Sequence, residues 1–420
     1  MSQHFRPSAF APFRVRSFRF QWPADLLTSC AFEMETLILG WYVLVETGSV
    51  LLLTLYGALL FIGTLVSPLV GVIGDRIGQR NVLCCMRAFY TLLAVTLMAI
   101  AFAGALTPLI VFIIAGLMGL VRPSDLGVRG ALVADIMPAD QLIGAMGISR
   151  TTQDAARVMG ALAGAGLFAA FGMAQAYVVV AVCYGLGLLL TLGIDSRRAH
   201  THKLEEAAVG MPRPSHWRDL KEGLAHVWSS PPLRAGMYLA VLVNLTAFPL
   251  SGSLLPYVAR EIYHINQTGL GYLVASFAFG ALIGSLSVSM SRGIRPGRAM
   301  ILSVLAWYVF LLAFAQTETL LAGVVALAFA GFAQSYGMIT LAVMLLRIAS
   351  ERFRGRIMGV RMMAIYGMPV GLLVAGVLID LIGFSTTATA YAAFGLLFTL
   401  FIALRWRKEL WRADTPANAR

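Results

Sequence analysis

Acidic side chains interrupt the first long apolar segment of the chain, residues 22–46. On a helix with 100° per residue, its polar and small positions fall within an arc of roughly 80°. These positions are Asp25, Ser29, Glu33, Thr36 and Gly40. Glu33 would lie roughly 16 Å into the segment at a rise of 1.5 Å per residue, where loss of water favours an uncharged carboxyl group. It could therefore exchange a proton or contact a substrate; alternatively, an arginine of a neighbouring helix holds it permanently. Glu35, at the edge of the stripe beside Thr28, is a second candidate for the same roles.

Two further segments carry charged residues at helical spacing. Arg150, Asp154 and Arg157 follow one another at i, i+4 and i+7 and would share one helix face. The two arginines either neutralise Asp154 within the helix or present surplus positive charge to an anionic substrate. Arg122 and Asp125 are spaced i, i+3, and we expect them to form a salt bridge.

The residue types that catalysis or metal binding would require do not occur in a suitable pattern. All six histidines lie in tails or loops, and the four cysteines lack metal-ligand spacing. The chain contains no Gly-x-Ser-x-Gly elbow and no Gly-x4-Gly-Lys-Ser/Thr loop. We therefore expect neither an enzyme nor an ATP-driven pump, and neither a metal nor a cofactor.

The composition indicates an integral membrane protein. Hydrophobic residues make up 59% of the 420 and charged residues 12%, so too few polar residues remain to cover a soluble surface. The net charge of +12 does not indicate nucleic acid as a partner, because the charges lie at alternate ends of apolar segments. A helix of about 20 apolar residues crosses a bilayer. About twelve such segments occur, at 22–46, 50–73, 82–104, 107–135, 142–171, 174–194, 234–256, 268–290, 299–316, 319–346, 357–382 and 386–405.

A long polar stretch divides these segments into six and six. We expect an N-terminal six-helix bundle at 1–194, a cytoplasmic central loop at 195–233 and a C-terminal six-helix bundle at 234–420. Within the loop, residues 217–228 space apolar side chains at helical intervals, which predicts an amphipathic helix on the membrane surface.

The two halves also resemble each other in sequence. Residues 138–147 lead into the fifth segment much as residues 350–359 lead into the eleventh. Ala163-Gly164 matches Ala375-Gly376 at the same offset. Such a repeat is typical of two pseudo-symmetric bundles. The predicted fold class is therefore all-α, with twelve transmembrane helices in two related bundles around a central cavity.

Basic residues mark one side of this predicted membrane protein. They gather in both tails, in the central loop and in the loops that precede the third, ninth and eleventh segments. The alternate loops carry no Lys or Arg except Arg260, between the seventh and eighth segments. Because positive charge favours the cytoplasmic side, both termini are predicted to be cytoplasmic.

The turn between the second and third segments has the spacing Gly-x3-Asp-Arg-x-Gly-x-Arg. Its residues are Gly71, Asp75, Arg76, Gly78 and Arg80. This turn resembles the signature loop between helices 2 and 3 of the major facilitator superfamily of secondary transporters. Similar loops lock the two halves on the cytoplasmic side. The resemblance therefore implies a gate in which Asp75 is attracted by Arg129 and by the N-terminal end of the eleventh helix, where Arg354 and Arg356 lie.

Other motifs narrow the resemblance to the enterobactin-exporter and macrolide-efflux branch. They include Trp41-Tyr42-Val43 near the end of the first segment, Arg129-x-Ala131, and Arg354-Gly355-Arg356-x-Met358-Gly359. Arg157-x2-Gly160 with Gly164 is similar to the glycine motif of exporters, although Ala161 stands where a proline is usual.

This resemblance implies alternating access in the inner membrane of a bacterium. It also implies proton-coupled export of a small amphiphilic compound, such as a drug, a siderophore or a similar metabolite, by a monomer. The partners would then be the substrate, protons and the lipid bilayer. A proton-coupled uptake symporter is the main alternative, because the sequence does not show the direction of transport. A non-transporting membrane sensor or scaffold is the alternative from another class, although it would not need acids at mid-membrane.

Overall fold

The computed structural model describes residues 11–65, 77–195, 216–290, 295–349 and 353–412. Throughout these ranges the regular structure is helical, and no strand occurs, so the predicted all-α class is confirmed. The chain divides into two compact units, and each is described by itself. The first comprises residues 1–38 and 62–213, and the second comprises residues 39–61 and 214–420. Helix α1 therefore begins in the first unit and ends in the second.

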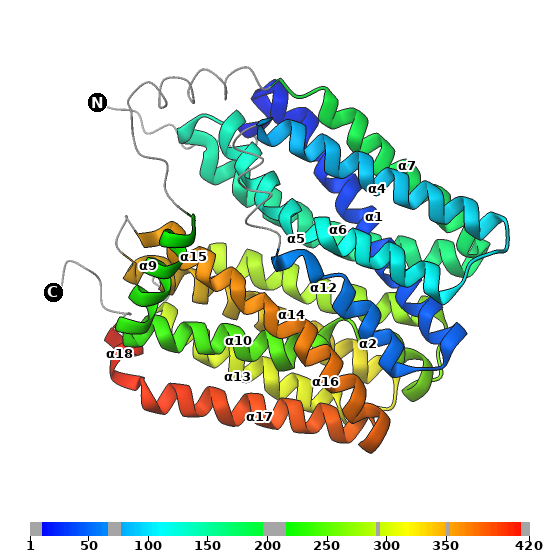
Figure 1. Ribbon diagram of the computed structural model, residues 1–420. Coiled ribbons are helices and arrows are strands. Elements are labelled where there is room, and N and C mark those ends of the chain that lie inside the picture. Colours follow the sequence, from blue (N-terminus) through cyan, green and yellow to red (C-terminus); the bar gives the residue numbers. More distant parts are fainter. Residues whose placement is uncertain (1–10, 66–76, 196–215, 291–294, 350–352, 413–420) are drawn as a thin grey trace. The chain divides into compact units, whose positions relative to one another are not determined.

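The first unit holds most of the N-terminal helices (Figure 1). They are α1 (Arg16–Thr47, as far as Ile38), the 3-10 helices η1 (Ala11–Arg14) and η2 (Ile62–Leu65), α4 (Gln79–Phe102), α5 (Pro108–Ile136), α6 (Ala139–Phe171) and α7 (Met173–Leu192). Pro108 begins α5, and the Thr107 hydroxyl accepts a hydrogen bond from the Ile110 amide at that end. Proline at the first turn and threonine as the capping residue are favoured helix starts, because the first amides have no helical acceptor.

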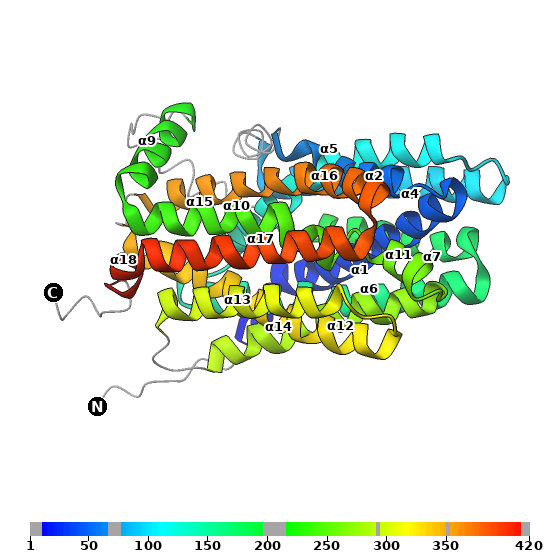
Figure 2. The same cartoon turned by 90° about the horizontal axis from the view of Figure 1, so that it is seen from below.

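The second unit holds the remaining helices (Figure 2). They are α2 (Val50–Leu59), α9 (His216–Ser229), α10 (Pro231–Ser251), α11 (Leu255–Tyr257), the π-helix η3 (Val258–Ile262), α12 (Gln267–Met290), α13 (Pro296–Phe314), α14 (Leu320–Ile348), α15 (Arg354–Met363), η5 (Ala364–Tyr366), α16 (Gly367–Ile382), α17 (Phe384–Arg405) and α18 (Arg407–Arg412). The amphipathic helix predicted in the central loop corresponds to α9, which packs against α15.

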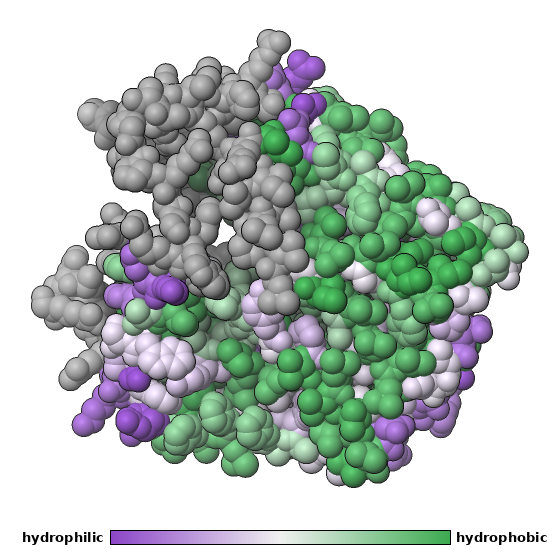
Figure 3. Space-filling model, viewed as in Figure 1, coloured by the Kyte–Doolittle hydropathy of each residue, from purple (hydrophilic) through white to green (hydrophobic). Residues whose placement is uncertain are grey.

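Ten of the described helices are long and apolar enough to cross a membrane. Helix α1 is 32 residues long, but its acidic residues lower its hydropathy. The apolar stretch Val50–Thr64 is shorter, and residues 66–76 after it lie outside the described ranges. The membrane class is thus confirmed, and the number of twelve stays a prediction. On the face shown in Figure 3, hydrophobic residues cover most of the described surface, and hydrophilic residues gather near helix ends.

Glycines allow close helix packing in both units. In the first unit, a Cβ at Gly160 or Gly164 of α6 would lie 2.7 Å or 2.8 Å from the backbone of α1. In the second unit, α12 and α14 approach so closely that a Cβ at Gly280 or Gly284 would meet the α14 backbone. Gly280 and Gly284 thus serve close helix packing.

The predicted repeat has a counterpart at two helix junctions. Gly172 ends α6 and begins α7 with φ 83°, and Gly383 ends α16 and begins α17 with φ 81°. Both backbones occupy a region that glycine tolerates and other residues avoid. A glycine with positive φ thus joins two helices at equivalent places in the two halves.

Candidate functional site

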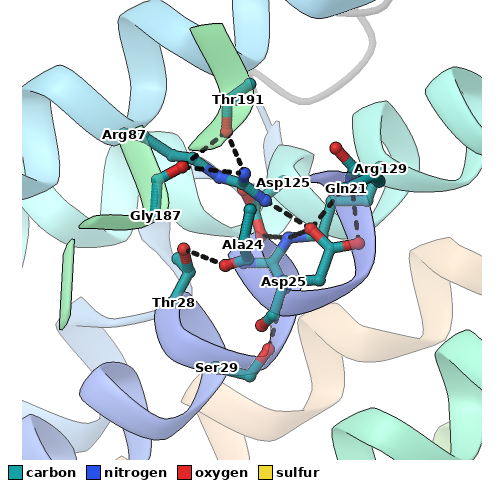
Figure 4. A network of polar contacts seen from close by, with 10 residues as sticks. All are labelled: Gln21, Ala24, Asp25, Thr28, Ser29, Arg87, Asp125, Arg129, Gly187 and Thr191. Carbon is teal, nitrogen blue, oxygen red and sulfur yellow. Dashed lines mark hydrogen bonds and ion pairs between the residues drawn. The ribbon is translucent and has the colours of Figure 1, made fainter. Parts of the chain in front are cut away.

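A buried network of charged residues joins four helices of the first unit (Figure 4). Asp25 of α1 forms an ion pair with Arg87 of α4 and lies 3.6 Å from Nε of Arg129 on α5. Arg129 also forms a 2.5 Å ion pair with Asp125, one turn away on the same helix. Arg87 extends the network to α7, where Thr191 accepts a hydrogen bond from it.

Neutral groups complete this network. Gln21 donates to both carboxylate oxygens of Asp25 at 2.9 Å, and the Ser29 hydroxyl accepts a 2.8 Å hydrogen bond from Arg129. The Arg87 side chain is 0% exposed. Two arginines thus balance two carboxylates in surroundings where an unpaired charge would be costly. This arrangement is suited to fixing the positions of α1, α4, α5 and α7 relative to one another.

Glu35 of α1 lies in a different environment. It is 4% exposed. Its carboxylate accepts hydrogen bonds from two tyrosines of α7, with Tyr184 at 2.9 Å and Tyr177 at 3.4 Å. These tyrosines are seven residues apart and therefore share one face of α7. The hydrogen-bond donors of Glu35 are thus phenol hydroxyls, and Arg122 also acts on its carboxylate electrostatically.

Glu33 is instead held by an arginine. Its Oε1 atom lies 3.4 Å from Nε of Arg157 on α6. A Cβ at Gly160, one turn further along α6, would lie 2.8 Å from Cβ of Glu33, so α1 and α6 touch at this point. Of the two alternatives left open for Glu33, this geometry corresponds to pairing with an arginine of a neighbouring helix.

The other charged side chains pair differently from the simplest expectation. Arg150 forms a 3.4 Å ion pair with Asp154, whereas Arg157 reaches Glu33. The expectation that both arginines neutralise Asp154 is therefore correct for one of them.

Asp125, which was expected to pair with Arg122, forms an ion pair with Arg129. Arg122 donates to the Thr36 hydroxyl at 3.3 Å and lies over the Phe32 ring. The i, i+3 spacing of Arg122 and Asp125 and the i, i+4 spacing of Asp125 and Arg129 both allow an ion pair. Arg129, however, contacts Asp125 and Asp25 at the same time.

The predicted cytoplasmic gate is described only in part. Gly71, Asp75 and Arg76 lie outside the described residues. Gly78 precedes α4 with φ 89°, and Arg80 donates a 2.5 Å hydrogen bond to the Leu192 carbonyl at the end of α7.

At the start of α15, Arg356 forms a 2.5 Å ion pair with Glu222 of α9. His226 of α9 stacks on Phe353 with the ring centroids 4.4 Å apart. Arg354 is exposed at the same end of α15. Helix α9 is thus attached to the start of α15, which the sequence did not predict.

The structure offers no metal centre in the part that it describes. No group of three or more His, Cys, Asp or Glu residues there could hold an ion.

Known proteins resemble the chain in sequence. A model of the Major Facilitator Superfamily matches residues 24–366 and 237–419. The Enterobactin exporter EntS of Escherichia coli O1:K1 / APEC is 27% identical over 315 residues, which are 73% of this chain and 70% of that protein. The Multidrug efflux pump Tap of Mycobacterium bovis (strain BCG / Pasteur 1173P2) is 23% identical over 389 residues, 88% of either chain.

Solved structures resemble the fold. The nucleoside transporter NupG superposes with a TM-score of 0.69 at 14% identity and covers 93% of this chain and 98% of its own. A D-xylose-proton symporter superposes with a TM-score of 0.68 at 15% identity and covers 92% of this chain and 96% of its own.

Proposed function

The chain belongs to the Major Facilitator Superfamily, and from this premise we propose that it exports a small amphiphilic compound by alternating access and that protons drive the export. It is a multi-pass membrane transporter and not an enzyme. The proposal of export is supported by two relatives, EntS and Tap, whose names describe an exporter and an efflux pump.

The environment of Glu35 carries the proposal of proton coupling. A coupling site must gain and lose a proton during the cycle. An ionised carboxylate deep in a membrane protein is costly, and a carboxylate with a bound arginine is kept ionised. Glu35 is buried and accepts hydrogen bonds from Tyr177 and Tyr184, so a proton can remove its charge while both phenol hydroxyls stay in place.

Glu33 is the weaker candidate for the same role. Its ion pair with Arg157 opposes protonation, because a proton on Glu33 would leave the arginine without its partner. Arg122, Arg150, Asp154 and Arg157 are proposed to contact the substrate or to support the helices that do. Asp75 and Arg129, with Arg354 and Arg356, are proposed to act in the cytoplasmic gate.

The proposed orientation places both termini in the cytoplasm, and the proposed location is the inner membrane of a bacterium. It is supported by the basic residues in the tails and in alternate loops. We also propose a monomer whose two six-helix halves extend over residues 1–194 and 234–420.

The test compares two variants in proteoliposomes. A panel of a macrolide, a catecholate siderophore and ethidium first identifies a compound that raises the melting temperature of the purified protein. With that compound, Glu35→Gln, which mimics the protonated acid, should keep substrate exchange and lose transport driven by a pH gradient. Glu33→Gln serves as the matched control and should lower the melting temperature and both activities together, because Arg157 loses its partner.

Three results would contradict the proposal. Full gradient-driven transport by Glu35→Gln would exclude that residue from coupling. Accumulation of the compound along the proton gradient would indicate the uptake symporter. No transport of any panel compound, with or without a gradient, would favour a sensor or scaffold.

A further inference from the structure

The first helical hairpin packs against C-terminal helices at one of its ends. Residues 39–61 cluster with the second unit, and α2 lies beside α16 (Figure 1). Thr54 of α2 faces Gly376 of α16 so closely that a Cβ at this glycine would meet it. Gly57 of α2 similarly faces Ser253 and Leu372. Because Gly57 and Gly376 have no side chains, α2 can pack closely against α16.

Arg260 makes a polar contact with the same hairpin within the second unit. Its guanidinium donates a hydrogen bond to the Leu44 carbonyl in the last turn of α1, and its Nε lies 3.3 Å from Glu261. This carbonyl also accepts the Gly48 amide at 2.9 Å. A cation is favoured there, because the C-terminal end of a helix carries partial negative charge.

The backbone at Arg260 differs from that of an ordinary helix. Residues Val258–Ile262 form a π-helix, a form that is rare and frequent at functional sites. In the sequence, Arg260 is the single basic residue in the loops expected outside the cytoplasm. The positive-inside rule disfavours a cation in a loop on the outer side. The hydrogen bond from Arg260 to the Leu44 carbonyl gives a reason for its presence there.

We propose that Arg260 is a latch that holds the outer end of the α1–α2 hairpin closed and that it must release Leu44 before the outer side can open. The proposal rests on the proposed function, because alternating access requires the outer ends to separate at one stage. Arg260 is a positioning residue, and it acts through the backbone of α1 and not through the transported compound.

The first experiment measures exposure and needs no substrate. Thr54, which is 0% exposed, is replaced in Thr54→Cys after the four natural cysteines have been changed to alanine. A membrane-impermeant thiol reagent is then added from outside. Arg260→Gln should raise the labelling rate about ten- to a hundredfold, which corresponds to the loss of one hydrogen bond from a charged donor.

Two matched controls define what the labelling means. Arg407→Gln removes an exposed arginine of α18 and should leave the labelling rate unchanged. Glu261→Gln removes the acidic neighbour of Arg260 but keeps the bond to Leu44, and it should also leave Thr54→Cys protected. Equal protection in Arg260→Gln and the parent would overturn the latch.

A second experiment remains decisive if Arg260→Gln does not fold. A Cβ at Gly376 would lie 3.2 Å from Cβ of Thr54, close to the roughly 3.5–4.5 Å that a disulfide requires. The pair Thr54→Cys with Gly376→Cys should therefore cross-link on oxidation, lose efflux of the panel compound and regain it with dithiothreitol. Normal efflux by the oxidised pair would show that the outer end need not open.

The two experiments separate the latch from the proposed function. If the parent transports no panel compound but Arg260→Gln still increases labelling, the latch stands and the transport proposal fails. If the parent transports and neither labelling nor cross-linking changes anything, the latch fails and the transport proposal stands.

Discussion

Removal of Arg87 should show how strongly the buried charge network holds the first unit. Arg87→Met keeps an unbranched chain of similar reach but deletes the cation that pairs with Asp25 and donates to Thr191 and the Gly187 carbonyl. Asp25 then keeps only Gln21 and the more distant Arg129. Loss of one partner of a buried ion pair costs about 3–5 kcal/mol, because the other charge stays buried.

The assay is a double-mutant cycle on the free energy of unfolding in detergent. Asp25→Asn in the Arg87→Met background should recover part of the loss, because it removes the stranded charge. Coupling energies between contacting residues are about 0.5–3 kcal/mol. Arg407→Met, at an exposed arginine, is the control and should change stability by no more than about 0.5 kcal/mol.

Two results would refute this reasoning about Arg87. One is an Arg87→Met protein within about 1 kcal/mol of the parent, well below the expected range. The other is strict additivity of Arg87→Met and Asp25→Asn, which would mean that the two side chains do not depend on each other.

Two further predictions concern packing and topology. Gly160→Leu should abolish folded protein in detergent, because even a Cβ would lie 2.7 Å from the Cys30 carbonyl oxygen. Gly166→Leu is the control and should be tolerated, because the space around its Cβ position is open to 4 Å. Equal yields of the two variants on size-exclusion chromatography would contradict this prediction. Ser49→Cys should react with an impermeant thiol reagent outside intact cells and Ser215→Cys should not, because the basic residues of the central loop indicate that it is cytoplasmic. Labelling of Ser215→Cys in intact cells would contradict the proposed orientation.

The helices could be predicted from the sequence because their length and apolarity follow from the bilayer. The segment expected at 174–194 is Met173–Leu192 in the structure, and the one at 107–135 is Pro108–Ile136. The largest difference at a helix start is in the first segment, which was expected from residue 22 and begins at Arg16. Apolarity marks only the part of a helix that lies in lipid, so polar turns at its ends are missed.

The charged site was harder to predict. Arg87 lies inside a segment that was treated simply as apolar, although an arginine within a membrane helix is itself a signal of function or pairing. The choice of partner had no local signal. Asp125 is at helical spacing from both Arg122 and Arg129, and Arg129 is favoured only because Asp25 of another helix lies within its reach.

The pattern of partners separates fixed charges from a charge that can change. Apart from the first and last four residues of each helix, the helices of the first unit contain five arginines and five carboxylates, namely Arg87, Arg122, Arg129, Arg150, Arg157, Asp25, Glu33, Glu35, Asp125 and Asp154. Four of the carboxylates form ion pairs with arginines, and these pairs hold both charges in place. Glu35 accepts hydrogen bonds from tyrosines instead. A proton on Glu35 would therefore change the net charge of the unit without disturbing the ion pairs that hold its helices together, and a proton-driven cycle requires such a site.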